Sequence, residues 1–421
     1  MTTYLAKRTL LAALLVVSTQ PARAQQPRDR IAADLAYLAA DAREGRGVGT
    51  AGLDSAARYI AAAFAAAGLR PAGTDGFFQP FMIDPSAPAA AHAGVGGAAV
   101  KNVVAMLPGR GALAGEAVVV GAHYDHLGRG GFGSLDPDST GVVHNGADDN
   151  ASGTVALLEI ARHLRGRTAP NARALILIAF TGEELGLLGS DYYVKHPVMP
   201  IRSTFAMINL DMVGRLRGDR VTVFGTETAR EFASLIDSLR ITSGLSIAGS
   251  GDGYGRSDQS SFYAADIPVL HFFTGTHEDY HRTTDDAPKI NVDGVARIAV
   301  LAADLAWALA TRESPLSFVD AEPPPPPAAG GGYGAYLGTI PDMSESPGGV
   351  RLTGVRAGSP AEAAGIKAGD VIVRLGDHEV TNLYQMTDAL RAHKPGDSVL
   401  VVVIRDGQRL ELRATLSQRG G

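Results

Sequence analysis

The chain has 421 residues, of which 45% are apolar and 19% charged, and it contains no cysteine. This composition is typical of globular proteins and excludes disordered, fibrous and disulfide-rich classes. The formal net charge of -6 offers no basic field to a phosphate backbone, so we expect no nucleic-acid partner. The length favours two folded units rather than one. Without cysteine, any metal ion must be bound by histidine and carboxylate side chains.

The first 24 residues have the features of an export signal. Lys7 and Arg8 precede an apolar run at 9–17, and Ala22-Arg23-Ala24 fits the site that signal peptidase cleaves. The alternative, a membrane anchor, is disfavoured because a span needs about 20 apolar residues. We therefore expect a mature protein that starts at Gln25 and acts in the periplasm or outside the cell. No later stretch of the sequence predicts a transmembrane helix.

Residues 25–315 alternate between short apolar runs and helical patterns. Buried strands are predicted at 117–120, 174–180, 205–210, 221–224 and 269–273. Helices are predicted at 34–40, 52–67, 155–164, 231–239 and 295–311. Strands that alternate with helices imply an α/β fold, in which helices flank a mostly parallel central sheet.

A break in composition follows at residues 316–332. The five prolines Pro323–Pro327 and the Ala/Gly run behind them cannot form a core, so this stretch predicts an interdomain linker. Residues 333–418 predict a second, small and strand-rich domain. Its strands are expected at 350–355, 370–375, 398–405 and 409–415, and its helices at 360–364 and 383–392.

Histidine and carboxylate side chains of the first domain lie where predicted strands end or a helix begins. They are His123, Asp148, Glu183, Glu184, Asp211 and His281. Each has an ordinary alternative explanation, such as a helix-capping role for Asp148 or Asp149 or a solvated loop at Glu183 and Glu184. Ligands collect at the carboxyl ends of parallel strands, however, and so many coincidences at one sheet edge favour a metal site. Histidine and carboxylate ligands suit catalytic zinc, and a two-metal hydrolase is the sharper hypothesis.

These residues stand in motifs that resemble a known family. The segments are His123-x-Asp125, residues 145–153 (NGADDNASG), Gly182-Glu183-Glu184, residues 209–212 (NLDM) and Tyr280-His281. In this order they are similar to the signature of the secreted di-zinc leucyl aminopeptidases, which are related to glutamate carboxypeptidases and glutaminyl cyclases. The resemblance covers roughly residues 30–312 and implies a zinc-exopeptidase fold.

The resemblance also implies a metal-binding role for five residues. His123 and Asp211 would bind one zinc ion, and Glu184 and His281 would bind the other. Asp148 would bridge both ions, so that each chain holds two.

Further roles follow from the same resemblance. Glu183 would be the general base, and Asp125 would accept the second imidazole N–H of His123. Tyr280 would donate its hydroxyl to the oxyanion, with ordinary aromatic packing as the alternative. Arg256 matches a segment of the family's substrate pocket, although Gln259 stands where relatives often have histidine.

Residues 127–144 form an insertion relative to compact members of the family. It separates His123 from Asp148, and we expect it to form a lid or a wall of the substrate pocket. His126, His144 and His277 are further imidazoles near the predicted site. We interpret them as loop or supporting residues rather than as additional ligands.

The second domain, residues 333–418, resembles a PDZ domain. Residues 335–340 fit the carboxylate-binding loop, and residues 359–370 (SPAEAAGIKAGD) are typical of bacterial PDZ modules. Such modules bind peptide C-termini along a strand edge, so we expect a peptide or protein C-terminus as partner. The alternative is a module that only packs against the peptidase.

Taken together, these features predict an exported zinc aminopeptidase that hydrolyses N-terminal residues from peptides. One alternative is a different reaction on the same scaffold, either by another exopeptidase or by a glutaminyl-cyclase-like enzyme. Another is a non-catalytic peptide-binding protein, which the complete ligand set and Glu183 argue against.

Overall fold

The computed structural model describes residues 26–136, 139, 141–251, 253–255, 257–320, 335–341, 348–356, 358–381, 385–386, 389–390 and 392–418. The expected signal segment 1–24 and the candidate Arg256 lie outside the described residues. So do residues 321–332 of the expected linker and half of the helix expected at 383–392. The described parts form two units with separate hydrophobic cores, the first around a nine-stranded sheet and the second around a six-stranded and a two-stranded sheet.

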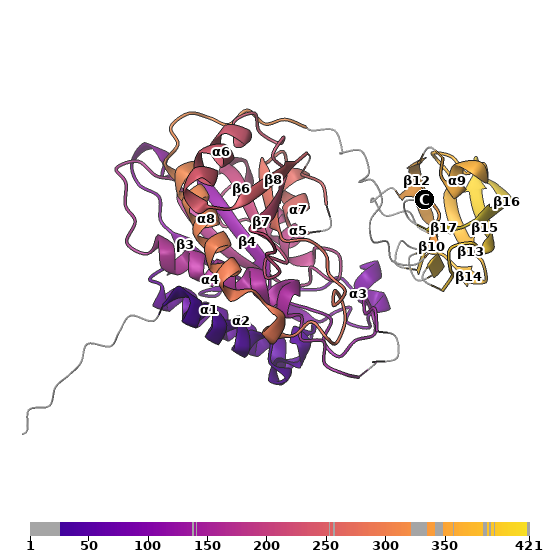
Figure 1. Ribbon diagram of the computed structural model, residues 1–421, viewed down its shortest axis with the longest axis horizontal. Helices are drawn as coiled ribbons and strands as arrows, with labels where there is room; N and C mark the ends of the chain where they lie inside the picture. Colours follow the sequence, from indigo (N-terminus) through magenta and orange to yellow (C-terminus); the bar gives the residue numbers. More distant parts are fainter. Residues whose placement is uncertain are drawn as a thin grey trace, which may run out of the picture.

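A mixed, mostly parallel sheet forms the centre of the first unit (Figure 1). Its strand order is β1-β3-β5-β4-β6-β9-β7-β8, and β2 pairs with β3. The central strands β5, β4, β6 and β9 are parallel, whereas β3 and β7 run antiparallel to β5 and β9. This arrangement confirms the expected α/β architecture. The strands are β1 (Arg70–Pro71), β2 (Phe78–Met82), β3 (Ala99–Leu107), β4 (Ala117–His123), β5 (Ala174–Phe180), β6 (Thr204–Leu210), β7 (Arg220–Phe224), β8 (Ser246–Ser250) and β9 (Val269–Phe273).

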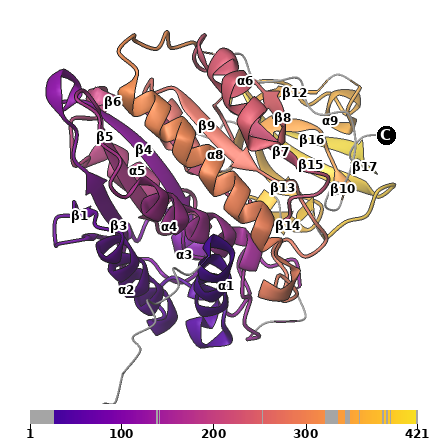
Figure 2. The ribbon, with the colours of Figure 1, turned by 60° about the vertical axis from the view of Figure 1, so that its left-hand side comes forward.

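Helices cover both faces of this sheet. They are α1 (Pro27–Leu38), α2 (Ala51–Ala66), α3 (Pro88–His92), α4 (Gly153–Leu164), α5 (Leu188–Lys195), α6 (Phe232–Ser243), α7 (Gln259–Tyr263) and α8 (Val292–Thr311). Figure 2 shows α8 lying over the sheet and running along its parallel strands, with α4 and α1 beside it. On the opposite face, Tyr193 of α5 and Phe262 of α7 pack on Val119, Met207 and Val269. Every residue of β4 and β5 is buried, as expected for central strands covered on both faces.

The helix α8 owes its apolar sequence to this core. Among the described residues it is the one helix long and apolar enough to cross a membrane by those two criteria. Val295, Ile298 and Leu305 are nevertheless buried against the sheet and its neighbouring helices. Its first turn is capped by Asn291, whose side chain accepts a hydrogen bond from the Gly294 amide.

The second unit is a small antiparallel sheet around a separate core. Its main strands follow the order β11-β12-β13-β15-β16, with β14 paired to β13, while β10 pairs with β17. Ser359 caps the short helix α9 by accepting a hydrogen bond from the Glu362 amide. The elements are β10 (Ala335–Tyr336), β11 (Thr339–Pro341), β12 (Val350–Val355), α9 (Pro360–Ala363), β13 (Val371–Leu375), β14 (His378–Glu379), β15 (Ser398–Arg405), β16 (Gln408–Thr415) and β17 (Ser417–Gln418).

The chain stays on the first unit for several residues beyond α8. The Val319 amide donates to the Thr228 carbonyl at 2.9 Å, and Tyr263 donates its hydroxyl to the Val319 carbonyl at 3.2 Å. The ring of Phe318 packs 5.6 Å from that of Tyr263. Residues 317–320, which the sequence pattern assigns to the linker, therefore belong structurally to the first unit.

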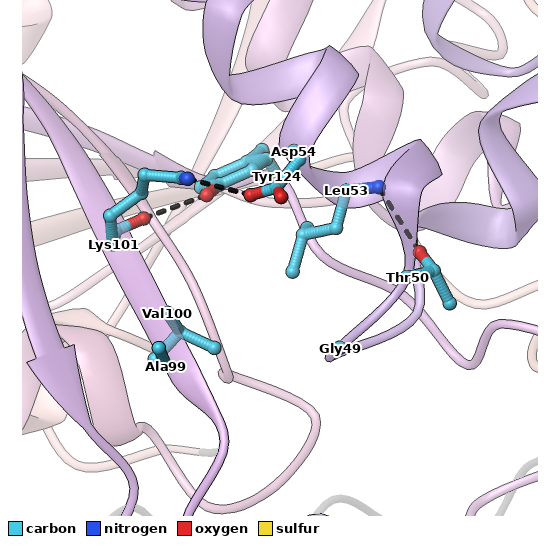
Figure 3. A pocket seen from close by; sticks show the side chains of 8 residues that line it. All are labelled: Gly49, Thr50, Leu53, Asp54, Ala99, Val100, Lys101 and Tyr124. Atoms are coloured by element: carbon cyan, nitrogen blue, oxygen red, sulfur yellow. Dashed lines mark hydrogen bonds and ion pairs between the residues drawn. The ribbon is translucent and has the colours of Figure 1, made fainter.

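A small cavity of about 60 Å³ lies between the start of α2 and β3 (Figure 3). Lys101 Nζ is 2.6 Å from Asp54 Oδ1, and the buried Tyr124 donates its hydroxyl to the Lys101 carbonyl at 2.7 Å. A polar space of this size suits a few water molecules, not a peptide. The hydrogen bond fixes Tyr124, which lies in the chain between His123 and Asp125 of the site described next.

Candidate metal centre

Two groups of metal-ligating side chains meet at the carboxyl ends of the parallel strands. In the first, which we call the His123 group, ligand atoms of His123, Glu183 and Asp211 all lie within 4.8 Å of one another. In the second, the Glu184 group, the same is true of His126, Asp149 and Glu184. His123 is the last residue of β4, and Asp211 directly follows β6. The fold therefore brings together side chains that lie far apart in the sequence.

Interatomic distances identify which atoms are spaced as ligands of a common ion. Two ligand atoms on one tetrahedral zinc ion lie about 3.3 Å apart, because Zn–N and Zn–O bonds are about 2.0 to 2.1 Å. His123 Nε2 is 3.4 Å from both Asp149 Oδ1 and Asp211 Oδ1. His281 Nε2 is 3.1 Å from both Asp149 Oδ2 and Glu184 Oε2. Asp149 thus turns one oxygen toward each imidazole, which is the geometry of a bridging carboxylate.

The carboxylate of Asp148, the residue expected to bridge, is engaged elsewhere. Its Oδ1 accepts hydrogen bonds from the Gly214 amide at 2.6 Å and from Ser152 Oγ at 2.9 Å. Its Oδ2 lies 3.0 Å from His277 Nε2. In the structure the Asp149 carboxylate, and not that of Asp148, lies between the two imidazoles, where the bridging ligand was expected. The turn that leads into α4 decides which of the two adjacent carboxylates faces the strand ends, and residue types alone do not reveal this.

The same turn is held by Asp285, which the sequence motifs do not single out. Its Oδ2 accepts hydrogen bonds from the amides of Asp148 and Asp149 at 2.8 and 3.1 Å. Its Oδ1 accepts from Arg215 at 2.9 Å, and the Asp285 side chain is fully buried. Asp285 therefore positions the backbone from which the Asp149 carboxylate projects.

His126 is spaced as a hydrogen-bond donor and not as a ligand. Its Nδ1 lies 2.7 Å from Glu184 Oε1, which is shorter than the roughly 3.3 Å between two ligands of one zinc ion. This is the length of a charge-assisted hydrogen bond to a carboxylate. Glu184 therefore lies between two imidazoles, with His126 on one oxygen and His281 on the other.

Asp125 is near His123, but through a different atom from the one expected. His123 Nδ1 is 3.2 Å from the Asp125 backbone carbonyl and 3.8 Å from the nearer carboxylate oxygen. The Asp125 carboxylate instead accepts the amides of Glu183 and Glu184 at 3.2 and 3.4 Å. Those two backbone donors occupy the carboxylate, so the carbonyl fixes the His123 ring while the side chain holds the Glu183–Glu184 turn.

Glu183 belongs to the His123 group, but its carboxylate lies farther from the His123 imidazole than those of Asp149 and Asp211. Its Oε2 lies 3.9 Å from His123 Nε2, farther than the 3.4 Å of the Asp149 and Asp211 oxygens. Burial raises the pKa of Glu183 well above its usual value, and the neighbouring Glu184 carboxylate adds to the shift. A carboxylate with a raised pKa beside a metal site is suited to carry a proton.

Tyr280 packs directly on a candidate ligand. Its ring stacks on the His281 imidazole, with centroids 3.9 Å apart and planes 24° from parallel. Burial raises the pKa of Tyr280 well above its usual value, and the charges of Asp149 and Glu184 raise it further. The hydroxyl therefore keeps its proton and can act as a hydrogen-bond donor.

Of the segment expected to line the substrate pocket, the structure describes the neighbours of Arg256. Asn209 Nδ2 donates to Ser257 Oγ at 2.8 Å and to Gln259 Oε1 at 3.0 Å. Between these two residues, Asp258 is fully buried, and burial raises its pKa to about 7. Gln259 thus ties this segment to the end of β6.

The candidate metal centre contains buried polar atoms without hydrogen-bond partners, as expected of atoms that would bind a cation. His123 Nε2 and Asp211 Oδ1 are buried and have no hydrogen-bond partner among the described residues. Buried polar atoms are normally paired, and these two lie 3.4 Å apart. Burial alone would raise the pKa of Asp149, but its contacts with His123 and His281 lower it well below the usual value. An anionic carboxylate between two imidazoles suits zinc, which takes nitrogen and oxygen ligands.

Comparison with known proteins agrees with this geometry. Residues 102–306 match the family model of Peptidase family M28, and residues 335–416 match that of the PDZ domain. The chain is 32% identical over 212 residues to Aminopeptidase YwaD of Bacillus subtilis (strain 168), covering 45% of this chain and 40% of that protein. The chain spans about half the length of the curated relatives it matches.

Solved structures show the same fold at low sequence identity. A Zn-dependent exopeptidase from Parabacteroides distasonis is 20% identical with a TM-score of 0.54, covering 66% of this chain and 97% of that chain. A glutaminyl cyclase from Porphyromonas gingivalis is 19% identical with a TM-score of 0.52, covering 66% of this chain and 96% of that chain. Because both identities are low, these similarities establish the fold and leave the reaction open.

Proposed function

We propose that this chain is an exported zinc aminopeptidase with two zinc ions, because residues 102–306 match the model of Peptidase family M28 and residues 335–416 match that of the PDZ domain. It would remove N-terminal residues from peptides in the periplasm or outside the cell. The observation that carries the proposal is the Asp149 carboxylate, which reaches His123 with one oxygen and His281 with the other. The name of the curated relative YwaD, an aminopeptidase, supports the same reaction.

The proposed ligand set divides between two ions. His123 and Asp211 would hold one zinc ion, Glu184 and His281 would hold the other, and Asp149 would bind both. Two zinc ions bound in this way polarise a scissile carbonyl and acidify water. The shared carboxylate offsets part of the repulsion between the two cations.

The remaining side chains would move or hold protons. Glu183 can take a proton from the attacking water and deliver it to the leaving amine, since its burial favours the protonated form. Tyr280 can donate its hydroxyl to the oxygen that becomes negative during attack. Asp125 keeps Glu183 and Glu184 in place, because its carboxylate accepts hydrogen bonds from their backbone amides.

An aromatic group beside Asp211 suggests the substrate class. The paired strands β6 and β9 place Asn209 beside His271, and the Asp211 amide, just after β6, donates to the Phe272 carbonyl at 3.2 Å. The half-buried rings of Phe224, His271 and Phe273 lie 5.6 to 6.0 Å from one another. Burial lowers the pKa of His271 to about 4, so its ring is neutral at physiological pH. We therefore infer a preference for apolar N-terminal side chains such as leucine or phenylalanine.

A panel of aminoacyl p-nitroanilides tests this function. We expect hydrolysis of the leucine and phenylalanine substrates in preference to those of aspartate or lysine. A chelator should abolish the activity, zinc should restore it, and metal analysis should find two zinc ions per chain. Cyclisation of an N-terminal glutaminyl peptide without any hydrolysis would instead indicate a cyclase. A single tightly bound ion would contradict the shared role of Asp149.

The second unit is proposed to bind a peptide or protein C-terminus. Its candidate carboxylate-binding loop joins β10 to β11 through Leu337 and Gly338. Gly338 has a φ of 84°, and a Cβ there would lie 2.2 Å from the Ser359 Cβ, so only glycine fits. The Gly338 carbonyl accepts from the Arg356 amide at 2.9 Å, which holds the loop in shape. A preorganised loop of this kind can present backbone amides to a carboxylate.

Cutting the chain within Pro323–Pro327 should leave an active peptidase. Every proposed ligand lies before α8, and the segment up to Asp320 that packs on Thr228 and Tyr263 is retained. We expect kcat/KM on leucine p-nitroanilide to stay within about twofold of the full-length enzyme. Long peptides are the informative comparison, because a tethered binding module raises their local concentration. A truncated protein that binds zinc but fails on the small substrate would show that the PDZ domain helps to form the active site.

A further inference from the structure

Residues 133–136, part of the segment 127–144 expected from the sequence to be an insertion, lie against the part of the chain that carries the candidate ligand His281. The Leu135 amide donates to the His281 carbonyl at 2.9 Å. His281 Nδ1 lies 2.8 Å from the Gly133 carbonyl oxygen. Both the backbone and the ring of His281 are therefore bonded to the insertion.

The Gly133 contact selects the tautomer of His281. A carbonyl oxygen can only accept a hydrogen bond, so Nδ1 must carry the hydrogen. Nε2 then offers its lone pair toward Asp149 Oδ2 and Glu184 Oε2, each 3.1 Å away. Histidine ligands generally donate their second N–H to an oxygen in this way, which orients the ring and raises its basicity.

Asp136 anchors the insertion to the two residues after His281. Its Oδ1 accepts from Arg282 Nη1 at 2.7 Å. Its Oδ2 accepts from the Thr283 amide at 2.9 Å and from Thr283 Oγ1 at 3.0 Å. Burial would raise the pKa of Asp136, but the hydrogen bonds from Thr283 and Arg282 lower it, so the carboxylate is ionised at neutral pH.

Bonds within the insertion hold Gly133 and Asp136 in place. Ser134 Oγ donates to His144 Nε2 at 2.8 Å and accepts from the Asp136 amide at 3.0 Å. His144 Nδ1 in turn donates to the Val142 carbonyl at 3.0 Å. His144 is fully buried, so this polar pair is shielded from competing water.

His281 itself has a backbone conformation that depends on such support. Its φ of 56° lies in the left-handed region, which non-glycine residues seldom adopt. Residues in this region persist where the surrounding structure fixes them. Gly133 and Leu135 bond to His281 itself, and Asp136 bonds to the two residues after it.

We propose that the insertion supports the metal site. Gly133 sets the tautomer of His281, and Asp136 positions the His281–Thr283 segment so that His281 can bind the same zinc ion as Glu184. This inference rests on the proposed two-zinc function. It goes beyond the lid or pocket wall expected from the sequence, because it gives the insertion a role toward a metal ligand.

Zinc titration of full-length Asp136→Ala tests the proposal. We expect one of the two zinc ions to bind about 10 to 100-fold more weakly, the usual effect of losing a residue that orients a ligand, while the other keeps its affinity. Asp136→Asn keeps an acceptor for Thr283 but loses the charge facing Arg282, so we expect an intermediate effect. Asp84→Ala is the matched control, because Asp84 is an exposed loop aspartate that accepts from the amide and hydroxyl of Ser86. It should change neither affinity.

Two further measurements separate positioning from general structural support. In ¹⁵N-histidine spectra of the zinc-loaded wild type, the Nδ1–H of His281 should be protected from exchange, and this protection should be lost in Asp136→Ala. A structural role alone would lower the thermal midpoint of the zinc-free protein and weaken both ions equally. Unchanged affinities in both Asp136 variants, with a wild type that binds two zinc ions, would overturn this inference and leave the proposed function intact. A wild type that binds no zinc would overturn both.

Discussion

Replacing Glu183 with alanine is expected to lower kcat by about 10² to 10⁴-fold while both zinc ions remain bound. The loss follows from the proposed proton transfer, because no other carboxylate of the His123 group is free of a proposed ligand role. Retention of zinc follows from the geometry, since Glu183 Oε2 lies 3.9 Å from His123 Nε2, beyond the spacing of the proposed ligand atoms. Single-turnover kinetics and metal analysis on the same preparation measure both quantities.

The neighbouring residue provides the matched control for this prediction. Glu184→Ala should release one zinc ion, because Glu184 Oε2 lies 3.1 Å from His281 Nε2. Glu183→Gln should resemble Glu183→Ala, since an amide keeps the shape of the side chain but cannot accept and return the proton. Equal zinc loss in the Glu183 and Glu184 variants would show that both residues are ligands and that the base lies elsewhere.

The strands that the sequence predicts best are those whose residues are uniformly apolar. The runs 174–180 and 269–273 coincide with β5 and β9, and each is central in the sheet. The strands β2 and β3 are not expected from the sequence because polar residues interrupt their pattern. Asn102 Nδ2 donates to Gln79 Oε1 at 3.0 Å across the two strands, so polar groups that look like loop residues are paired and buried. Only the three-dimensional partner explains why they are tolerated there.

The sequence predicts which segments form the site, but not which atoms of those segments face one another. Strand ends place His123 and Asp211 together by topology, which a sequence pattern can indicate. Short-range geometry decides the rest. The backbone carbonyl of Asp125, and not its carboxylate, bonds to His123. Asp285 accepts hydrogen bonds from two amides that lie more than 130 residues away in the sequence. Neither contact can be predicted from residue type or from spacing in the sequence.

Substitutions of the adjacent residues Asp148 and Asp149 test which of the two carboxylates binds zinc. Asp149→Asn should lose at least one zinc ion. The carboxylate offers one oxygen to the zinc ion beside each imidazole, whereas an amide has a single ligand oxygen. Its zinc affinity should fall by more than the roughly 10 to 100-fold that a supporting residue costs. Asp148→Asn should keep both ions. Its effect should instead be on folding, with a loss of about 1 to 3 kcal/mol, because the buried partners Gly214 and His277 lose a charged acceptor.

Zinc titration and denaturant unfolding of the zinc-free proteins distinguish the two variants. The comparison is well matched, since both substitutions remove the same charge from buried side chains one position apart. Unfolding without zinc is essential, because bound metal stabilises the folded state by mass action and would hide a defect in packing. If Asp148→Asn lost zinc and Asp149→Asn retained it, the bridging role would return to Asp148. The geometry argues for the opposite result, because Asp149 alone of the two places an oxygen within 3.4 Å of His123 Nε2 and another within 3.1 Å of His281 Nε2.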